Sequence, residues 1–127
     1  MRLTERIKNI VELNLQDYYI PLVVRANDSV RMFPMYYARI IGGDTIAFPV
    51  TNATGIEKAL KGWSKAYAMV SDRAGGYEAY VLKGRARYES NETDYQLVAE
   101  MRNVVPGFPI HGAVVFRVEE CHLAPPP

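Results

Sequence analysis

The chain has 127 residues, of which 49% are hydrophobic, and its 15 basic and 14 acidic side chains give a formal net charge of +1. This length suits one domain over residues 1–127, and folding it buries roughly two-thirds of the surface that the extended chain exposes. The balanced charge argues against a nucleic-acid partner, because such proteins usually carry a strong positive excess.

Cysteine usage and the first residues of the chain bear on location. Cys121 is the only cysteine, so the chain can form no internal disulfide and has no thiolate cluster for zinc. Residues 1–19 carry charges throughout and no continuous apolar run, unlike a signal peptide or a membrane span. We therefore expect a cytoplasmic protein that has no membrane partner.

The first third of the chain predicts one helix followed by two strands. Residues 4–14 place apolar side chains at spacings of three and four with charged residues between them, which is typical of an amphipathic helix. Residues 18–26 and 29–41 are rich in β-branched and aromatic side chains and are separated by the turn residues Asn27 and Asp28. This pattern predicts a hairpin of two long strands.

The rest of the chain predicts four more strands and two more helices from the same periodicities and turn signals. The predicted strands cover residues 45–50, 65–72, 77–88 and 112–119, and the predicted helices cover residues 54–62 and 90–103. In the strand 77–88, Leu82 and Ala86 are expected to face the core, while Arg85 and Arg87 face solvent or a partner.

The stretch between the third strand and the second helix is the most informative part of the sequence. Thr51 and Asn52 are polar, and Thr54 and Glu57 have the spacing of a capping box. Hydroxyl groups and the free backbone N–H groups of a helix start attract anions, and Lys58 adds positive charge. An ordinary capping box explains the same residues without any ligand, so both interpretations stay open.

Strands follow one another in hairpin order and do not alternate regularly with helices, which argues against a parallel doubly wound sheet. The sequence therefore predicts a mainly β fold, a six-stranded antiparallel β-barrel with short flanking helices. A barrel would also remove the exposed edges of such apolar strands.

No catalytic motif of known spacing is present. His111 and His122 stand outside any zinc-binding or nucleophile pattern, so we predict no metal site. Cys121 lies beside Glu119 and Glu120, whose carboxylates would raise the pKa of its thiol and lower its reactivity. The sequence also lacks a Walker loop, a dinucleotide fingerprint and a nucleophile elbow.

Aromatic side chains gather around the predicted hairpin and the strand after it, including Phe33, Tyr37 and Phe48. Aromatic residues in strands usually pack in a core or an interface. A planar ligand also needs apolar walls, and an apolar slot beside an anion-binding loop, with Arg31 or Arg39 on a neighbouring strand, suits a planar ring linked to a phosphate.

The order of these elements and four short runs resemble the FMN-binding split barrels related to pyridoxamine 5′-phosphate oxidase. The runs are RMFPM at 31–35, FPVTN at 48–52, KAYAMV at 65–70 and YVLKGRA at 80–86. The last run looks like the glycine-arginine-alanine strand of that family. The resemblance covers nearly the whole chain and implies a six-stranded antiparallel split β-barrel that binds FMN.

The resemblance also implies cofactor-binding residues and partners. By position, the cofactor-binding residues are Arg31, Met32, Phe33, Pro34, Thr51, Asn52, Thr54 and Lys58. Arg31 would meet the phosphate, residues 32–34 would line the isoalloxazine, and the threonines and Asn52 would flank the ribityl phosphate. The resemblance further implies an oxidoreductase that acts on a small-molecule substrate or a redox partner, as a homodimer with FMN at the subunit interface.

One departure from the family keeps alternatives open. Many members carry a basic pair at the helix start, whereas here the first lysine is Lys58 and it follows Glu57. Phosphate binding would then be weaker or follow another route. The alternatives are a non-enzymatic flavin carrier, a split-barrel dimer without cofactor, and a protein that binds deazaflavin or haem, because this fold does not determine its ligand.

Overall fold

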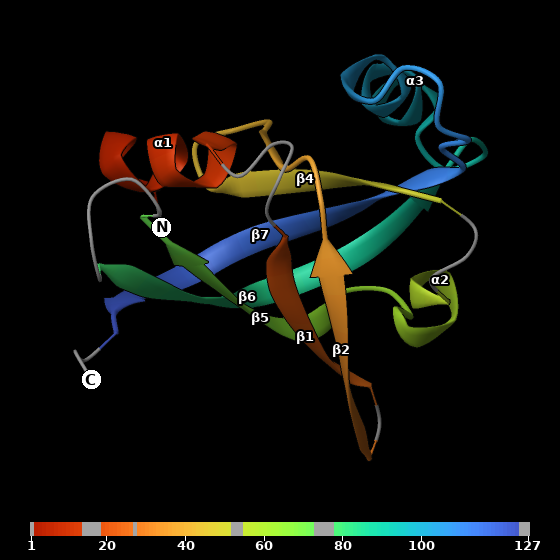
Figure 1. Ribbon diagram of the computed structural model, residues 1–127. Helices are drawn as coiled ribbons and strands as arrows, with labels where there is room; N and C mark the ends of the chain where they lie inside the picture. The colour runs from red at the N-terminus through yellow and green to blue at the C-terminus, as the bar shows by residue number, and fades with distance from the viewer. Residues whose placement is uncertain (1, 14–18, 27, 52–54, 73–77, 125–127) are drawn as a thin grey trace.

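The computed structural model describes residues 2–13, 19–26, 28–51, 55–72 and 78–124, and its elements are labelled in Figure 1. The helices are α1 (Glu5–Leu13), α2 (Ile56–Ala59) and α3 (Tyr95–Val104). The strands are β1 (Ile20–Ala26), β2 (Ser29–Met35), β3 (Arg39–Ile40), β4 (Thr45–Val50), β5 (Ser64–Ser71), β6 (Ala79–Ser90) and β7 (Gly112–Leu123).

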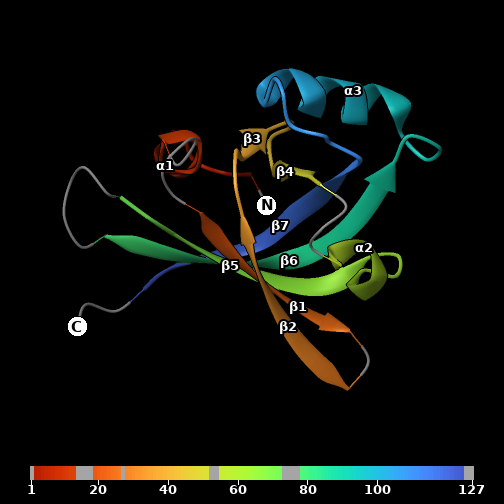
Figure 2. The same cartoon turned by 45° about the vertical axis from the view of Figure 1, so that its right-hand side comes forward.

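The seven strands form one antiparallel sheet in the order β2-β1-β5-β6-β7-β4-β3. The β1–β2 hairpin projects away from the other strands, as Figure 2 shows. The predicted mainly β, antiparallel architecture with short helices is confirmed. The predicted number of six strands is wrong, and the sheet is open, because among the described residues β2 and β3 are its unpaired ends.

The seventh strand arises from a break inside the predicted strand 29–41. Tyr37 has a φ of 58°, in the left-handed region that residues with a side chain seldom occupy. A strand cannot continue through this conformation, so the chain leaves β2, turns and starts β3, which pairs with β4. The turn carries the chain from one end of the sheet to the other and marks the split between β2 and β4.

The main core lies on the inner face of the curled sheet and is covered by α1. The helix contributes Ile7, Ile10 and Val11 to a buried cluster that also contains strand residues such as Leu22 and Phe116. The spacing of these three helix residues is the one that predicted the amphipathic helix. Burying them fixes α1 on the sheet.

A second, smaller core lies on the outer face of β4 and β7, under α3. Leu97 and Met101 from α3 pack against Ala47, Ala113 and Val115. Figure 1 shows α1 and α3 toward opposite ends of β4. The two helices therefore cover different parts of the sheet, and much of the outer face of β1, β5 and β6 stays exposed.

The alternation predicted for the fifth strand is confirmed in β6. Leu82 and Ala86 are fully buried, whereas Arg85 and Arg87 are exposed. Both strands end later than predicted, because β6 continues to Ser90, which pairs with Gly112, and β7 continues to Leu123, which pairs with Tyr80. The predicted end of the last strand at residue 119 is therefore too early.

The second helix is shorter than the predicted range 54–62. Gly55 is its N-cap, with a φ of 75° and no side-chain cap hydrogen bond, and Leu60 already has an extended backbone. The predicted cap at Thr54 lies outside the described residues. Only one turn of helix forms, because the flanking residues adopt non-helical conformations on both sides.

The third helix begins at Tyr95 and not at residue 90, as the sequence suggested. Residues 90–94 form a turn in which the Asp94 N–H donates to the Ser90 carbonyl at 2.9 Å. Asp94 then caps the helix, because its Oδ1 accepts a hydrogen bond from the Leu97 N–H at 3.1 Å. Within the described ranges, no helix is long and apolar enough to cross a membrane.

Candidate functional site

Successive residues of β2 face different parts of the molecule. Phe33 is buried in the main core, whereas Arg31, Met32 and Pro34 each line a separate surface hollow. We call these the cationic hollow, the outer hollow and the split hollow. Strand β2 is therefore the common wall of all three hollows.

The cationic hollow measures about 610 Å³ and lies between the β1–β2 hairpin and the segment formed by α2 and the start of β5, which Figure 2 shows side by side. Its charged residues are Arg25, Arg31, Lys58, Lys61, Lys65 and Asp28. Five basic side chains thus face one acidic side chain. Such a hollow attracts anions, because the opposing charges do not balance within it.

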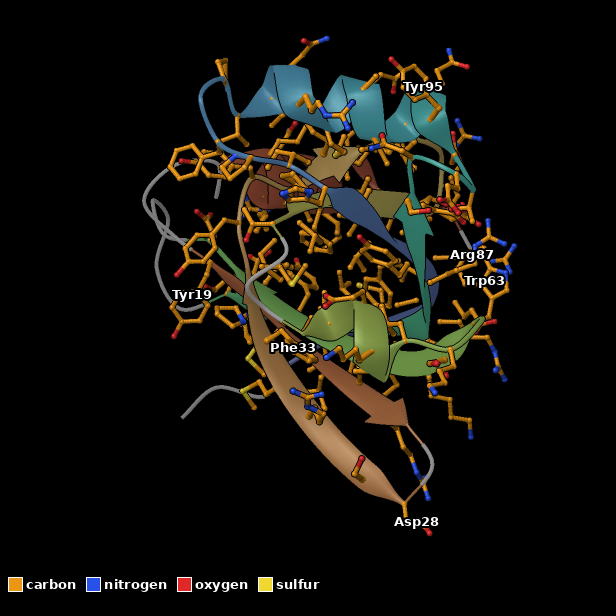
Figure 3. The ribbon with its side chains drawn as sticks, turned by 90° about the vertical axis from the view of Figure 1, so that its right-hand side faces the viewer. Tyr19, Asp28, Phe33, Trp63, Arg87 and Tyr95 are labelled. Atoms are coloured by element: carbon orange, nitrogen blue, oxygen red, sulfur yellow. The ribbon has the colours of Figure 1, made fainter. Side chains whose placement is uncertain are left out.

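Arg31 is held at the rim of this hollow by an aromatic contact. Its guanidinium carbon lies 5.1 Å from the centre of the Phe33 ring, and the buried ring, labelled beside α2 in Figure 3, gives it a firm support. A Cβ atom at Gly55 would lie 3.8 Å from Arg31 Nη2. The guanidinium is therefore presented at the start of α2, where Lys58 also lies.

The split hollow measures about 410 Å³ and is formed where β2 and β4 end and diverge. Its lining residues are Pro34, Met35, Tyr36, Tyr37, Pro49, Val50, Thr51, Val105, Phe108 and Ile110. The wall is largely apolar, and its side-chain polar groups are three hydroxyls. These walls are suited to a flat apolar or aromatic group.

Phe108 is a wall of the split hollow that the sequence reasoning missed. It lies in the run Pro106-Gly107-Phe108-Pro109, which follows the predicted helix 90–103. In the structure the Phe108 N–H donates to the Val105 carbonyl at 3.3 Å, and Gly107 has a φ of 89°. This turn leaves the Phe108 side chain 59% exposed. The signal available in the sequence was an aromatic residue flanked by the turn-forming residues Gly107 and Pro109.

The predicted cofactor residues divide between these places. Arg31 and Lys58 come together in the cationic hollow, and Pro34 and Thr51 come together in the split hollow. Met32 faces the outer hollow and Phe33 faces the core. Asn52 and Thr54 lie outside the described residues. Of the described residues on either side of them, Thr51 lines the split hollow and Gly55 lies beside Arg31.

The outer hollow measures about 400 Å³ and lies on the exposed face of β1, β2, β5 and β6. Its lining residues are Tyr19, Pro21, Val23, Met32, Tyr67, Ala68, Met69 and Val81. Met32 is 68% exposed and Met69 is 48% exposed. A continuous apolar surface of this kind marks a binding surface more often than a solvated one.

One titratable group near α2, the phenol of Tyr88, is perturbed by burial. Burial raises the pKa of the Tyr88 phenol, and the nearby Glu57 carboxylate raises it further. The Tyr88 ring occupies the space that a Cβ at Gly112 would need. Glu57 Oε2 is buried without a hydrogen-bond partner within the described residues.

Groups with metal or nucleophile chemistry are sparse. Burial raises the pKa of the Cys121 thiol, which keeps it protonated and unreactive at neutral pH. Over the described ranges, no three His, Cys, Asp or Glu side chains gather closely enough to hold a metal ion. The split hollow is lined by groups that can hold and shield a planar molecule.

A curled antiparallel sheet, a split between β2 and β4 and short flanking helices define the split-barrel class of β proteins. No protein-family model and no curated protein matches the sequence. Solved structures do match it. HupZ of Group A Streptococcus has a TM-score of 0.76 at 11% identity, with 95% of this chain and 93% of that chain covered.

Two other solved structures carry names that bear on ligands. An FMN-binding protein from Syntrophomonas wolfei has a TM-score of 0.73 at 16% identity, with 95% of this chain and 85% of that chain covered. A candidate pyridoxamine 5′-phosphate oxidase from Lactobacillus delbrueckii has a TM-score of 0.71 at 16% identity, with 95% and 93% covered. At these identities the likeness establishes the fold, so the resemblance seen in the sequence is confirmed at the level of the split barrel.

Proposed function

We propose that the chain binds FMN at the junction of the cationic and split hollows and acts as an FMN-dependent oxidoreductase. The observation that carries this proposal is that both hollows have β2 as a wall, with Arg31 lining the cationic hollow and Pro34 lining the split hollow. One hollow suits a phosphate and the other suits a flat ring. The FMN-binding protein from Syntrophomonas wolfei, which has the same fold, supports this ligand.

The phosphate end of FMN fits the residues of the cationic hollow. Arg31 can offer two parallel N–H donors to phosphate oxygens, and Lys58 adds a point charge. Ser29 and Ser64 also line the hollow and bring hydroxyl donors. The contact with Phe33 reduces the freedom of the Arg31 side chain, so less conformational entropy is lost when a phosphate binds.

The ring end of FMN fits the split hollow. Pro34, Tyr37 and Phe108 provide part of its largely apolar wall, and its volume lies within the range usual for ligand pockets. A bound flavin supplies the hydride and electron chemistry. The chain then has to bind the ring, orient it and keep water from it, for which no acidic or basic side chain is required.

The outer hollow supports a homodimer with the cofactor at the subunit interface. Met32 lies on the exposed apolar face, and Pro34, two residues further along β2, lines the split hollow. A second copy of the chain seated on this face would therefore cover the apolar surface and border the ring site. A small-molecule substrate or a redox partner would approach the ring from the side of the split hollow that faces solvent.

Replacing Arg31 tests the phosphate end. Arg31→Ala is expected to weaken FMN binding by about 1.5–3 kcal/mol, the usual contribution of hydrogen bonds to a charged group, which is about 10- to 150-fold in affinity. Quenching of flavin fluorescence on titration measures the dissociation constant. Arg39→Ala is the matched control, because Arg39 lies on β3 and lines neither hollow.

The same titration decides between the proposal and its alternatives. A purified protein that shows no flavin absorbance and cannot be titrated with FMN would refute FMN binding. A deazaflavin that binds where FMN does not would assign a different cofactor to the site. An unchanged dissociation constant in Arg31→Ala would remove Arg31 from the phosphate site.

A further inference from the structure

Three basic side chains lie directly opposite one another on the outer face of the sheet. Lys65 on β5 pairs with Arg85 on β6, and Arg85 pairs with Arg117 on β7. All three are exposed, and their strand neighbours Ala66 and Ala86 are buried on the other face. Like charges directly opposite in a ladder destabilise a sheet, so this row calls for an explanation.

The chain itself provides little compensating charge. Arg85 Nε lies 3.9 Å from Glu119 Oε1, and both side chains are well exposed, so this ion pair is weak. Among the residues that the structure describes, no carboxylate lies within ion-pair distance of Lys65 or Arg117. Two of the three charges in the row are therefore available to an outside anion.

An aromatic side chain holds one end of the row in place. The guanidinium carbons of Arg117 and Arg87 each lie 4.5 Å from the centre of the Trp63 ring. Figure 3 shows Trp63 and Arg87 side by side at the edge of the molecule. Arg87 is also tied to the buried Glu89 at 2.5 Å. These contacts orient Arg117 before any ligand arrives, which favours binding.

The positive row is short and is bounded on two sides by residues that are not basic. Arg117 faces the neutral Thr45 on β4, and one step along the strands Lys83 faces the acidic Glu120. At its other end Lys65 lines the cationic hollow. Because acidic and neutral residues interrupt the positive surface, it suits a compact multivalent anion and not a long polyanion such as a nucleic acid.

We propose that Lys65, Arg85 and Arg117 form a second anion site, which binds a small molecule carrying a chain of linked phosphates. Neighbouring strands are about 4.8 Å apart, so three cations span about 10 Å, and their long side chains can converge on several phosphates. This site borders the cationic hollow at Lys65 but does not include Arg31 or Lys58, to which the FMN phosphate is assigned. It extends the proposed function by adding a separate oligophosphate ligand on the outer face.

The chain contains a built-in reporter for this site, because Trp63 is its only tryptophan. We expect sodium tripolyphosphate, added to the full-length chain at constant ionic strength, to change the tryptophan fluorescence saturably. Calorimetry measures the affinity independently of the tryptophan fluorescence. Arg117→Gln is expected to weaken binding about tenfold or more, whereas Arg2→Gln, outside the row, leaves it unchanged.

Other arms of the experiment separate the possible outcomes. An equal response to sodium chloride or sulfate would reduce the row to a general ion atmosphere and overturn the proposal. So would an unchanged affinity in folded Arg117→Gln and in Lys65→Gln, which serves if the first variant does not fold. ATP binding at least as tightly as tripolyphosphate supports recognition of the phosphate chain, and ATP binding without tripolyphosphate binding overturns it.

The two anion sites can be tested independently. Arg31→Ala is expected to leave tripolyphosphate affinity unchanged, and Arg117→Gln is expected to leave FMN affinity unchanged. Loss of both ligands in either variant would show that the chain has one continuous anion surface, which contradicts a separate second site.

Discussion

Gly84 shows how a single residue can be required by a backbone contact. The β6–β7 ladder shifts register between Lys83 and Gly84, and this brings the two backbones unusually close. A Cβ at Gly84 would lie 1.9 Å from the Arg117 carbonyl oxygen and 2.9 Å from its carbonyl carbon. Backbone atoms in a ladder cannot move aside as a flexible side chain can, so only glycine fits.

Gly84→Ala is therefore expected to lower the free energy of unfolding by about 1–3 kcal/mol or more, as overpacking does in a tight interior. Gly42→Ala is the matched control, because the nearest atoms to its Cβ position lie 3.8 Å away, and it should change stability by less than about 0.5 kcal/mol. Urea unfolding measures both. Equal effects of the two substitutions would contradict the close approach at Gly84.

At the scale of elements, an ionic cluster ties α1 to the facing ends of β5 and β6. Arg6 Nη2 lies 2.6 Å from Asp72 Oδ2, and Arg6 Nε donates to Glu78 Oε1 at 3.2 Å. The Tyr80 hydroxyl donates to the same Glu78 oxygen. The hydrogen bond from Tyr80, followed by that from Arg6, holds the pKa of the Glu78 carboxyl below its ordinary value of 4.5.

This cluster predicts a pH-dependent stability. A carboxyl whose pKa is lowered by folding stabilises the protein above its unfolded pKa, and this contribution is lost as the pH falls through the lower folded pKa. Tyr80→Phe removes the donor, so its melting temperature should be below that of the parent at pH 7, with a smaller gap well below pH 4.5. Tyr67→Phe should match the parent at both pH values. A gap that persists in acid would contradict this role of Glu78.

Local sequence patterns predicted a helix or strand well where the physical cause of that element lies in its own residues. The spacing in α1 follows from burying one helix face, and the alternation of Leu82 and Arg85 in β6 follows from the pleat of a half-buried strand. The break at Tyr37 was not predictable in this way. A tyrosine seldom adopts a left-handed φ, so its sequence gives no sign of one. Tyr37 adopts it where the chain crosses from one end of the sheet to the other.

The candidate site was predicted only in part for the same reason. The family resemblance placed Arg31, Met32 and Pro34 in one binding run, but the pleat and curl of β2 direct them to three hollows. Trp63 was passed over because its partners are Arg87 and Arg117, far along the chain. Sequence periodicity predicts which face a side chain occupies, and the sheet order decides what it meets there.

At the scale of the whole molecule, a net charge of +1 conceals a marked separation of surfaces. Basic side chains gather in the cationic hollow and along the row of Lys65, Arg85 and Arg117. The neighbouring outer hollow is apolar. Total charge therefore says little about local affinity for anions, and the apolar surface beside the basic ones is the feature that a second subunit would cover.

The homodimer is tested by placing a charge on that apolar surface. Met32→Glu should convert a dimer into a monomer, because burying an unpaired carboxylate in an interface is costly. Light scattering after gel filtration measures the mass. Tyr95→Glu is the matched control, because Tyr95 on α3 is 66% exposed, against 68% for Met32, and lies outside the outer hollow.

The same substitution links assembly to the cofactor. If the ring site borders the subunit interface, Met32→Glu should also weaken FMN binding, although Met32 lines neither the cationic nor the split hollow. A parent protein that is monomeric, or a Met32→Glu variant that stays dimeric, would contradict this interface. Dissociation into monomers with unchanged FMN affinity would keep the dimer but place the cofactor wholly within one subunit.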